Sequence, residues 1–193
     1  MRSSLGFAPE DYVLLGSGES TPEASHKDAA WAAGILHVYD PRYRLLLWGR
    51  GPAADSVYRF NRRLIDPQLL CMAQRHLGRD TEYEELLSVA DMVLVTAEGP
   101  VAPLPICMAM AAGLPIVAAV TPTVSELLED RRTAIMLKPG SPRELAQKIL
   151  RLREDPPLQR RLGDAARAEA YEFFSMSRFL EEYRTLYRRL GRS

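Results

Sequence analysis

A glutamate followed by a Gly-Pro pair stands directly before a predicted helix in TAEGPVAPLPICMAMAAGLPIVAAV, residues 96–120. Glu98 is the carboxylate of this segment, and Gly99, Pro100 and Val101 lead from it toward the helix start. The first amides of a helix have no partner within the helix, and with the helix dipole they favour a phosphate or a carboxylate. We therefore expect Glu98 and the three residues after it to belong to a site for an anionic ligand.

Glycines and hydroxyl groups gather in a second segment, GSGESTPEASHK, residues 16–27. Gly16 and Gly18 allow the backbone to approach a ligand closely, and Lys27 lies near a predicted helix start. Backbone amides and a lysine could hold a phosphate there. The alternative interpretation is a surface loop without a ligand, and this segment alone does not separate the two.

Two further loops carry candidate binding residues. Gly49 and Gly51 in WGRGP permit a tight turn but do not form the GxGxxG motif of dinucleotide-binding proteins. His76 in AQRHLGRD could contact a base or a phosphate, but no second His or Cys lies at ligand spacing, so we expect no metal site. The sequence also lacks GxSxG, GxxxxGK[ST] and HExxH motifs, which leaves chemistry by a side-chain nucleophile unsupported.

Short apolar segments alternate with helical segments along the chain, and this alternation must position the four loops. The apolar runs are too short for soluble helices, and several lack the alternation of a half-exposed strand, as is typical of strands buried on both faces. The pattern predicts an α/β fold, a doubly wound, Rossmann-like parallel sheet of about six strands with C-terminal helices. In such a sheet, ligands bind beyond the carboxyl ends of the strands. The predicted strands are 12–16, 43–49, 68–72, 91–95, 114–120 and 134–138, and the predicted helices are 25–39, 53–65, 81–89, 103–112, 124–128 and 142–153.

The last predicted helix, near residues 176–190, carries its apolar side chains on one face. We expect this face to pack on the sheet layer. Thr81 and Glu84, Thr123 and Glu126, and Ser141 and Glu144 have the spacing of capping boxes, which predicts three helix starts. No linker or internal repeat interrupts the chain, so we expect residues 1–193 to form a single domain.

The composition restricts the partners and the compartment. The chain has 25 basic and 25 acidic residues and a formal net charge of +0, so no overall field attracts it to nucleic acid or to an anionic membrane. Cys71 and Cys107 both lie in apolar runs, which favours buried thiols in a reducing compartment. No run approaches ~18 apolar residues, and the N-terminus lacks the apolar core of a signal peptide. We therefore expect a cytoplasmic protein without a transmembrane segment.

Five segments, taken in order, resemble the C-terminal, donor-binding lobe of family 4 (group 1) glycosyltransferases of the GT-B fold. They are LLLWGRGP, HLGRDTEYEELLSVADMVLV, the EGP loop, MAMAAGLPIVAAVTPTVSELLEDRRTAIMLKPGSPRELAQKIL and LGDAARAEAYEFFSMSRFLEEYRTLY. The resemblance implies a nucleotide-diphosphate sugar as the donor and retaining glycosyl transfer, with the diphosphate leaving group stabilised by basic side chains and helix amides. It implies no metal ion and no cofactor besides the donor substrate.

Carried over to this sequence, the resemblance assigns Glu98 to the catalytic carboxylate beside the transferred sugar and Lys27 to a diphosphate-binding lysine. Two positions depart from the family pattern. Met108 stands where a glutamate holds the ribose, and a thioether cannot accept hydroxyl hydrogen bonds as a carboxylate does. Ser17 stands where an arginine neutralises the diphosphate, and Glu19 nearby would repel it. The residues expected at the donor site are Gly16, Gly18, Lys27, Gly49, Gly51, His76, Gly99, Pro100, Val101 and Met108.

The resemblance also implies an N-terminal lobe that binds an unidentified acceptor, a glycan or a lipid-linked molecule, and the 193 residues do not include that lobe. We therefore expect the isolated lobe to transfer no sugar, and peripheral attachment to a membrane stays open for a longer protein. Two alternatives also stay open. One is a non-catalytic relative that keeps the fold as a binding or scaffold module. The other is an enzyme that recognises its donor through Arg50, Arg75 or His76.

Overall fold

Six parallel strands form the centre of the computed structural model, which describes residues 1–64 and 69–190. Their order is β3-β2-β1-β4-β5-β6, so the two middle strands, β1 and β4, each begin one half of the sheet. Leu14 of β1 lies opposite Leu45 of β2 on one side and Met92 of β4 on the other. This topology confirms the predicted doubly wound α/β fold. The strands are β1 (Tyr12–Gly16), β2 (Tyr43–Leu47), β3 (Leu70–Met72), β4 (Met92–Val95), β5 (Ile116–Ala119) and β6 (Ile135–Leu137).

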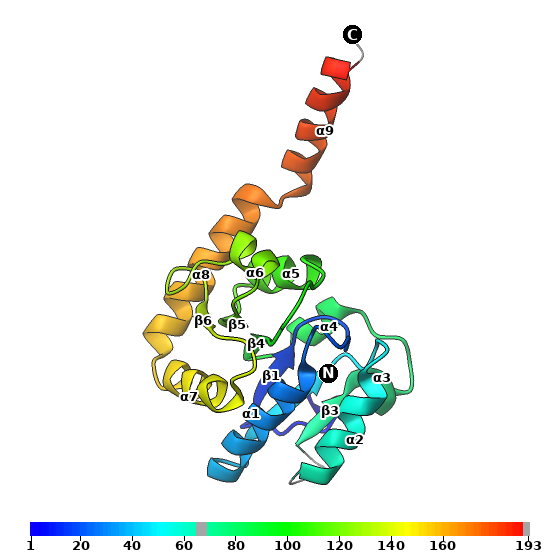
Figure 1. Cartoon of the computed structure of the whole chain (residues 1–193), viewed down its shortest axis with the longest axis vertical. Coiled ribbons are helices and arrows are strands. Elements are labelled where there is room, and N and C mark those ends of the chain that lie inside the picture. Colours follow the sequence, from blue (N-terminus) through cyan, green and yellow to red (C-terminus); the bar gives the residue numbers. More distant parts are fainter. Residues whose placement is uncertain (65–68, 191–193) are drawn as a thin grey trace.

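Helices cover both faces of the sheet (Figure 1). One apolar core joins the sheet to α1, α2 and α7 through side chains such as Leu36, Val57 and Ile149. The other core lies on the opposite face and includes Leu5 of the 3-10 helix and Met110 of α5. Because both faces are covered, β4 and β5 are buried along their whole length, which explains their continuous apolar runs. The helices are η1 (Ser3–Leu5), α1 (His26–Tyr39), α2 (Ala54–Leu64), α3 (Ala73–Leu77), α4 (Tyr83–Leu87), α5 (Leu104–Ala112), α6 (Pro122–Leu127), α7 (Pro142–Arg153), α8 (Pro156–Phe173) and α9 (Met176–Leu190).

All six predicted strands are present, most of them shorter than expected, and Ile65 and Gln68 of the predicted elements lie outside the described residues. Of the three predicted capping boxes, only the Ser141 position is confirmed as an N-cap, and its side chain makes no capping bond.

The other two capping boxes are wrong. α4 is capped by Glu82, whose backbone N–H donates to the Glu85 carboxylate at 3.3 Å. α6 begins earlier than expected because Pro122 suits the first helical position, and the hydroxyl of Thr121 accepts the Val124 N–H at 3.3 Å.

Two helices differ from the prediction. Residues 73–77 form α3 where a loop was expected, so His76 lies on a helix. α9 has no buried residue, and it projects away from the body beyond α8 (Figure 1). The expected packing of its apolar face on the sheet is therefore wrong, because other helices already occupy both faces of the sheet.

In the described part of the chain, no helix is both long enough and apolar enough to cross a bilayer. The two cysteines are free, as expected. Burial raises the pKa of Cys71 to about 11 and also raises the pKa of Cys107, although Cys107 is only partly buried. Both thiols are therefore protonated near neutral pH, which makes them poor nucleophiles.

Candidate ligand site at the carboxyl edge of the sheet

A pocket of about 350 Å³ opens beyond the carboxyl ends of β1 and β4, where the strand order reverses. This reversal is the position at which open α/β sheets bind ligands, and the volume lies within the range of small-molecule sites. The floor is made by Val95, the last residue of β4, and by the two residues after it, Thr96 and Ala97. The walls come from the β1–α1 loop, from the segment that enters α5, and from Trp48 after β2; those residues are Ser17, Gly18, Glu19, Thr21, Glu23, Ala24, Pro100, Val101, Ala102, Leu104 and Pro105.

The β1–α1 loop is fastened to the floor of the pocket by polar contacts. The buried Thr96 hydroxyl donates to the carbonyl of Ala24 at 2.8 Å, and the backbone N–H of Glu98 donates to the carbonyl of Glu23 at 2.8 Å. Gly99 lies so close to Glu23 that a Cβ on this glycine would come within 3.2 Å of that side chain. The segment predicted to be either a phosphate loop or a free surface loop is thus a defined wall of the pocket.

The N-terminus of α5 faces the pocket through Leu104 and Pro105. Proline has no N–H, so Pro103 and Pro105 remove two of the donors that a helix start usually offers to an anion. The N–H of Ile106 already donates to the carbonyl of Pro103 at 3.0 Å. The helix dipole still favours negative charge here. However, the start of α5 offers an anion fewer free N–H groups than we expect from an ordinary helix start.

The charge on the pocket wall is negative. Glu19 and Glu23 both line the pocket, while none of its lining residues is lysine or arginine. A diphosphate carries negative charge, and like charges within a few ångströms repel each other. The residues that line the pocket therefore supply no positive charge to balance a diphosphate, and Ser17, where the family resemblance implies an arginine, is one of them.

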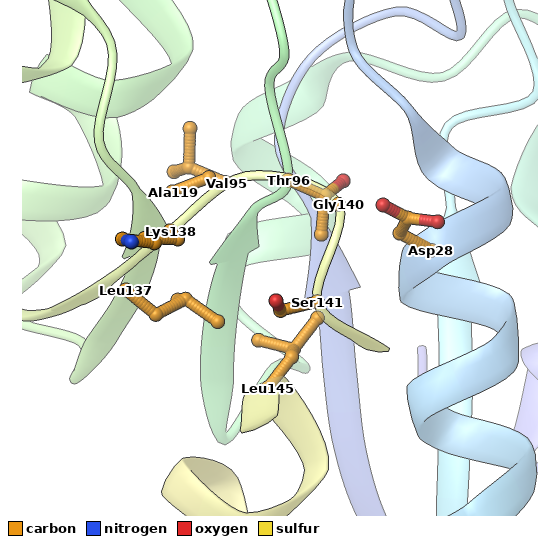
Figure 2. A pocket seen from close by; sticks show the side chains of 9 residues that line it. All are labelled: Asp28, Val95, Thr96, Ala119, Leu137, Lys138, Gly140, Ser141 and Leu145. Atoms are coloured by element: carbon orange, nitrogen blue, oxygen red, sulfur yellow. The ribbon is translucent and has the colours of Figure 1, made fainter. Parts of the chain in front are cut away.

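Glu98 lies beside a second, smaller hollow at the carboxyl ends of β4, β5 and β6. Its Oε1 atom would be 3.1 Å from a Cβ placed on Gly140, which lines that hollow. Figure 2 shows the carboxylate of Asp28 reaching from α1 toward Gly140. Burial, and after it the charge of Glu98, raises the pKa of Asp28 above its usual value. Two carboxylates from distant parts of the sequence thus meet at this edge, and the exposed Lys138 also lines the hollow.

The structure brings only some of the predicted donor-site residues to the pocket. Gly18, Pro100 and Val101 line it directly. Gly16 ends β1 beneath it, and a Cβ on Gly16 would clash with Leu47. Gly99 supports the pocket wall through its packing on Glu23, as described above.

Two predicted contacts lie elsewhere. Lys27 is exposed on the first turn of α1 and is not among the residues that line the pocket. Met108 lines a groove between α4 and α5 together with Leu87 and Leu114. A side chain at position 108 in this orientation contacts that groove and not the pocket.

The remaining candidates are not among the residues that line the pocket. Gly49 and Gly51 adopt positive φ angles of 89° and 100° in the loop after β2. His76 faces the N-terminal turn, with Cε1 at 3.6 Å from a Cβ placed on Gly6. Arg50 stacks over the Trp48 ring at 4.6 Å and pairs with Asp80. Arg75 lies over Tyr58 at 4.8 Å and pairs with Asp55, so both arginines are engaged with other side chains.

Sequence reasoning missed four residues around the site: Trp48, His26, Asp28 and Lys138. Trp48 lines the pocket, and its indole N–H donates to the carbonyl of Thr81 at 2.6 Å. Trp48 and Lys138 each follow the last residue of a strand, the position from which the sheet rule selects ligand contacts. The predicted strands 43–49 and 134–138 included both residues, so the rule did not select them.

Comparison with known proteins gives three related findings. A family model described as glycosyl transferases group 1 matches residues 1–169. An N-acetyl-alpha-D-glucosaminyl L-malate synthase from Bacillus anthracis is 28% identical over 188 residues, which cover 97% of this chain and 48% of that protein. The chain spans about half the length of the curated relatives it matches.

Solved structures share the fold. The C-terminal domain of a glycosyl transferase group 1 family protein (LpcC) from Francisella tularensis superposes with a TM-score of 0.76 at 15% identity, over 91% of this chain and 93% of that one. Anabaena Alr3699/HepE in complex with UDP and glucose gives a TM-score of 0.80 at 21% identity, over 96% of this chain and 50% of that one. At these identities the likeness shows a common fold.

Proposed function

Because the chain belongs to the group 1 glycosyl transferases, we propose that it binds a nucleoside-diphosphate sugar in the pocket between the β1–α1 loop and the N-terminus of α5. The observation that carries the proposal is the position of this pocket. It opens at the reversal of the strand order, in a fold shared with a structure that contains UDP and glucose. The chain would then be the donor lobe of a transferase.

The proposed chemistry is retaining glycosyl transfer. The bond between the anomeric carbon of the sugar and the diphosphate oxygen breaks, and a bond from that carbon to the oxygen of an acceptor hydroxyl forms on the same face. The hydroxyl proton passes to the departing nucleoside diphosphate. Glu98 is proposed to contact the transferred sugar, because its carboxylate lies with Asp28 at the edge of the sheet where the sugar would extend. The dipole of α5 would stabilise the departing diphosphate.

We propose that transfer needs a second lobe, which binds the acceptor. The curated relatives are about twice as long as this chain, which supports the proposal. The exposed apolar face of α9 is a surface that such a lobe would cover, with Phe179, Tyr183 and Tyr187 at 47–67% exposure. The negative wall of the pocket means that cations for the diphosphate would also come from outside the residues that line it.

A second candidate function is a non-catalytic binding module. The favouring observation is the pair Glu19 and Glu23 in a pocket wall without lysine or arginine. Such a wall suits a neutral glycan better than a nucleoside diphosphate, because carboxylates accept hydrogen bonds from sugar hydroxyls.

Calorimetric titration with UDP and with UDP-glucose tests the proposal. We expect weak but saturable binding to the wild-type chain, and tighter binding by Ser17→Arg, because Ser17 lines the pocket and an arginine there adds a bidentate phosphate contact. Met108→Glu is the matched control and is expected to leave the affinity unchanged, since Met108 lines the α4–α5 groove.

Binding that appears only in Ser17→Arg would favour the non-catalytic module. No binding by either protein, in samples shown to be folded by circular dichroism, would overturn the proposed donor site. A gain of affinity in Met108→Glu would show that this position reaches the ligand, in conflict with its placement in the groove.

A further inference from the structure

His26 is a buried histidine that lies outside the pocket. It is the first residue of α1, its exposed fraction is 2%, and it is not among the residues that line the pocket. Both of its ring nitrogens are nevertheless engaged, and both engage the β1–α1 loop. Its Nδ1 atom lies 2.8 Å from the Ser20 hydroxyl, and its Nε2 atom lies 3.1 Å from the carbonyl oxygen of Ser17.

These two partners define which ring nitrogen of His26 carries the proton. A carbonyl oxygen can only accept, so Nε2 must carry the proton that it donates to Ser17. In the neutral ring Nδ1 is then an acceptor, and the Ser20 hydroxyl donates to it. A neutral histidine with its proton on Nε2 thus forms hydrogen bonds with both the Ser17 carbonyl and the Ser20 hydroxyl.

Ser20 extends this contact to the loop after β2. Its backbone N–H donates to the carbonyl of Arg50, and its own carbonyl accepts the N–H of Ala53, both at 2.8 Å. Gly51 lies against the same residue so closely that a Cβ there would come within 2.5 Å of the Ser20 oxygen. Ser20 therefore joins His26 to a second loop at the carboxyl edge of the sheet.

The other end of the β1–α1 loop is joined to the loop after β4. The Glu98 N–H donates to the carbonyl of Glu23, and the Thr96 hydroxyl donates to the carbonyl of Ala24. Of the two acidic wall residues of the pocket, Glu19 lies between Ser17 and Ser20, the partners of His26. Glu23 is the residue whose carbonyl accepts the Glu98 N–H. Their placement therefore depends on bonds made by backbone atoms of the same loop.

We propose that His26 is a positioning residue, which holds the β1–α1 loop against the loops after β2 and β4 and so keeps the ligand pocket formed before a ligand arrives. The effect on ligand affinity rests on the proposed function. The physical reason for it is that a loop already held in its binding conformation loses less conformational entropy when the ligand binds.

Four variants test this role. His26→Leu removes both ring contacts, and Ser20→Ala removes the Ser20 contact from the other side without changing the buried ring. In His26→Gln the amide nitrogen can take the place of Nε2 and donate to Ser17, and in His26→Asn the amide oxygen can take the place of Nδ1.

Amide hydrogen exchange gives a readout that needs no ligand. The N–H groups of Ala53 and Glu98 donate to carbonyls of the β1–α1 loop, whereas the N–H of Leu45 in β2 donates to the carbonyl of Leu69, the residue before β3. We expect exchange at Ala53 and Glu98 to become about tenfold faster in His26→Leu and clearly faster in Ser20→Ala, with a smaller increase at Leu45. His26→Gln and His26→Asn are expected to fall between the wild type and His26→Leu.

Unchanged exchange at Ala53 and Glu98 in both His26→Leu and Ser20→Ala would overturn the proposal. Equal acceleration at Leu45 would overturn it as well, because His26 would then stabilise the whole domain without acting on the loops. In parallel, UDP affinity is expected to fall about fivefold in His26→Leu and to recover in part in His26→Gln. If the wild type binds no UDP, the proposed function fails, and hydrogen exchange still decides whether His26 positions the loops.

Discussion

The buried ring of His26 makes the stability of the domain sensitive to acid. Burial lowers the pKa of His26 from 6.5 to about 4, although its bond to the Ser17 carbonyl acts in the opposite direction. In the unfolded chain the ring is solvated and titrates near its ordinary pKa of ~6.5. As the pH falls below that value, the unfolded chain takes up a proton that the folded chain does not, so the free energy of unfolding decreases.

The magnitude follows from the two pKa values. The contribution of His26 is fully present above the unfolded pKa and is lost as the pH falls toward the folded pKa. Between about pH 7.5 and about pH 4.5, the linkage relation gives a loss of roughly 2.5 kcal/mol. This loss is large compared with the free energy of unfolding of a typical domain, which is about 5–15 kcal/mol.

Urea unfolding of the wild type and of His26→Gln across this pH range measures the contribution. Carboxylates titrate in both proteins, so the difference between the two curves isolates the histidine. At pH ~7.5 we expect the wild type to have a higher free energy of unfolding than His26→Gln. This difference should decrease by roughly 2.5 kcal/mol when the pH is lowered to ~4.5. His76→Gln, the same substitution at an exposed site, is the matched control. At neutral pH we expect it to change the free energy of unfolding by less than about 0.5 kcal/mol. Parallel curves for the wild type and His26→Gln would show that His26 does not couple folding to protonation.

Three further predictions concern the pocket wall, the loop after β2 and the last helix. Glu23→Gln removes a like charge from the pocket and is expected to raise UDP affinity about threefold in calorimetry, whereas an unchanged or lower affinity would show that this carboxylate does not face the phosphates. Gly51→Ala forces a side chain onto a backbone with a φ of 100° and against Ser20, so urea unfolding should show a loss of roughly 2–4 kcal/mol, and wild-type stability would contradict the described turn. Deletion of residues 176–193 should change the free energy of unfolding by less than about 1 kcal/mol, because α9 has no buried residue, and a larger loss would mean that α9 packs on the body.

The alternation of apolar and helical segments was enough to predict the sheet, because strands buried on both faces leave a clear apolar run. β1 and α7 even have the predicted ends. α3 was missed because it is a five-residue helix, too short for its side chains to show a helical period. The apolar face of α9 was recognised, but periodicity identifies a face without saying what covers it.

The site was predicted less completely, because it depends on contacts between distant loops. The sequence pointed to Glu98, but its approach to Gly140 and Asp28 arises only when β4, β6 and α1 meet at one edge. The role of His26 was likewise hidden, because a single histidine near a helix start has no motif. Met108 shows the converse, since its position in the sequence suggested the pocket while the rotation of α5 turns it toward α4.

In the proposed donor site, the pocket between the β1–α1 loop and α5 binds the nucleoside-diphosphate part of a sugar donor. A titration of ¹⁵N-labelled protein with UDP, followed by amide chemical shifts, tests this binding most directly. We expect saturable shifts for the amides of Ser17, Gly18, Thr96 and Ala97, which surround the pocket. Absence of shifts at millimolar UDP, or shifts confined to the α4–α5 groove around Met108, would contradict the proposed binding.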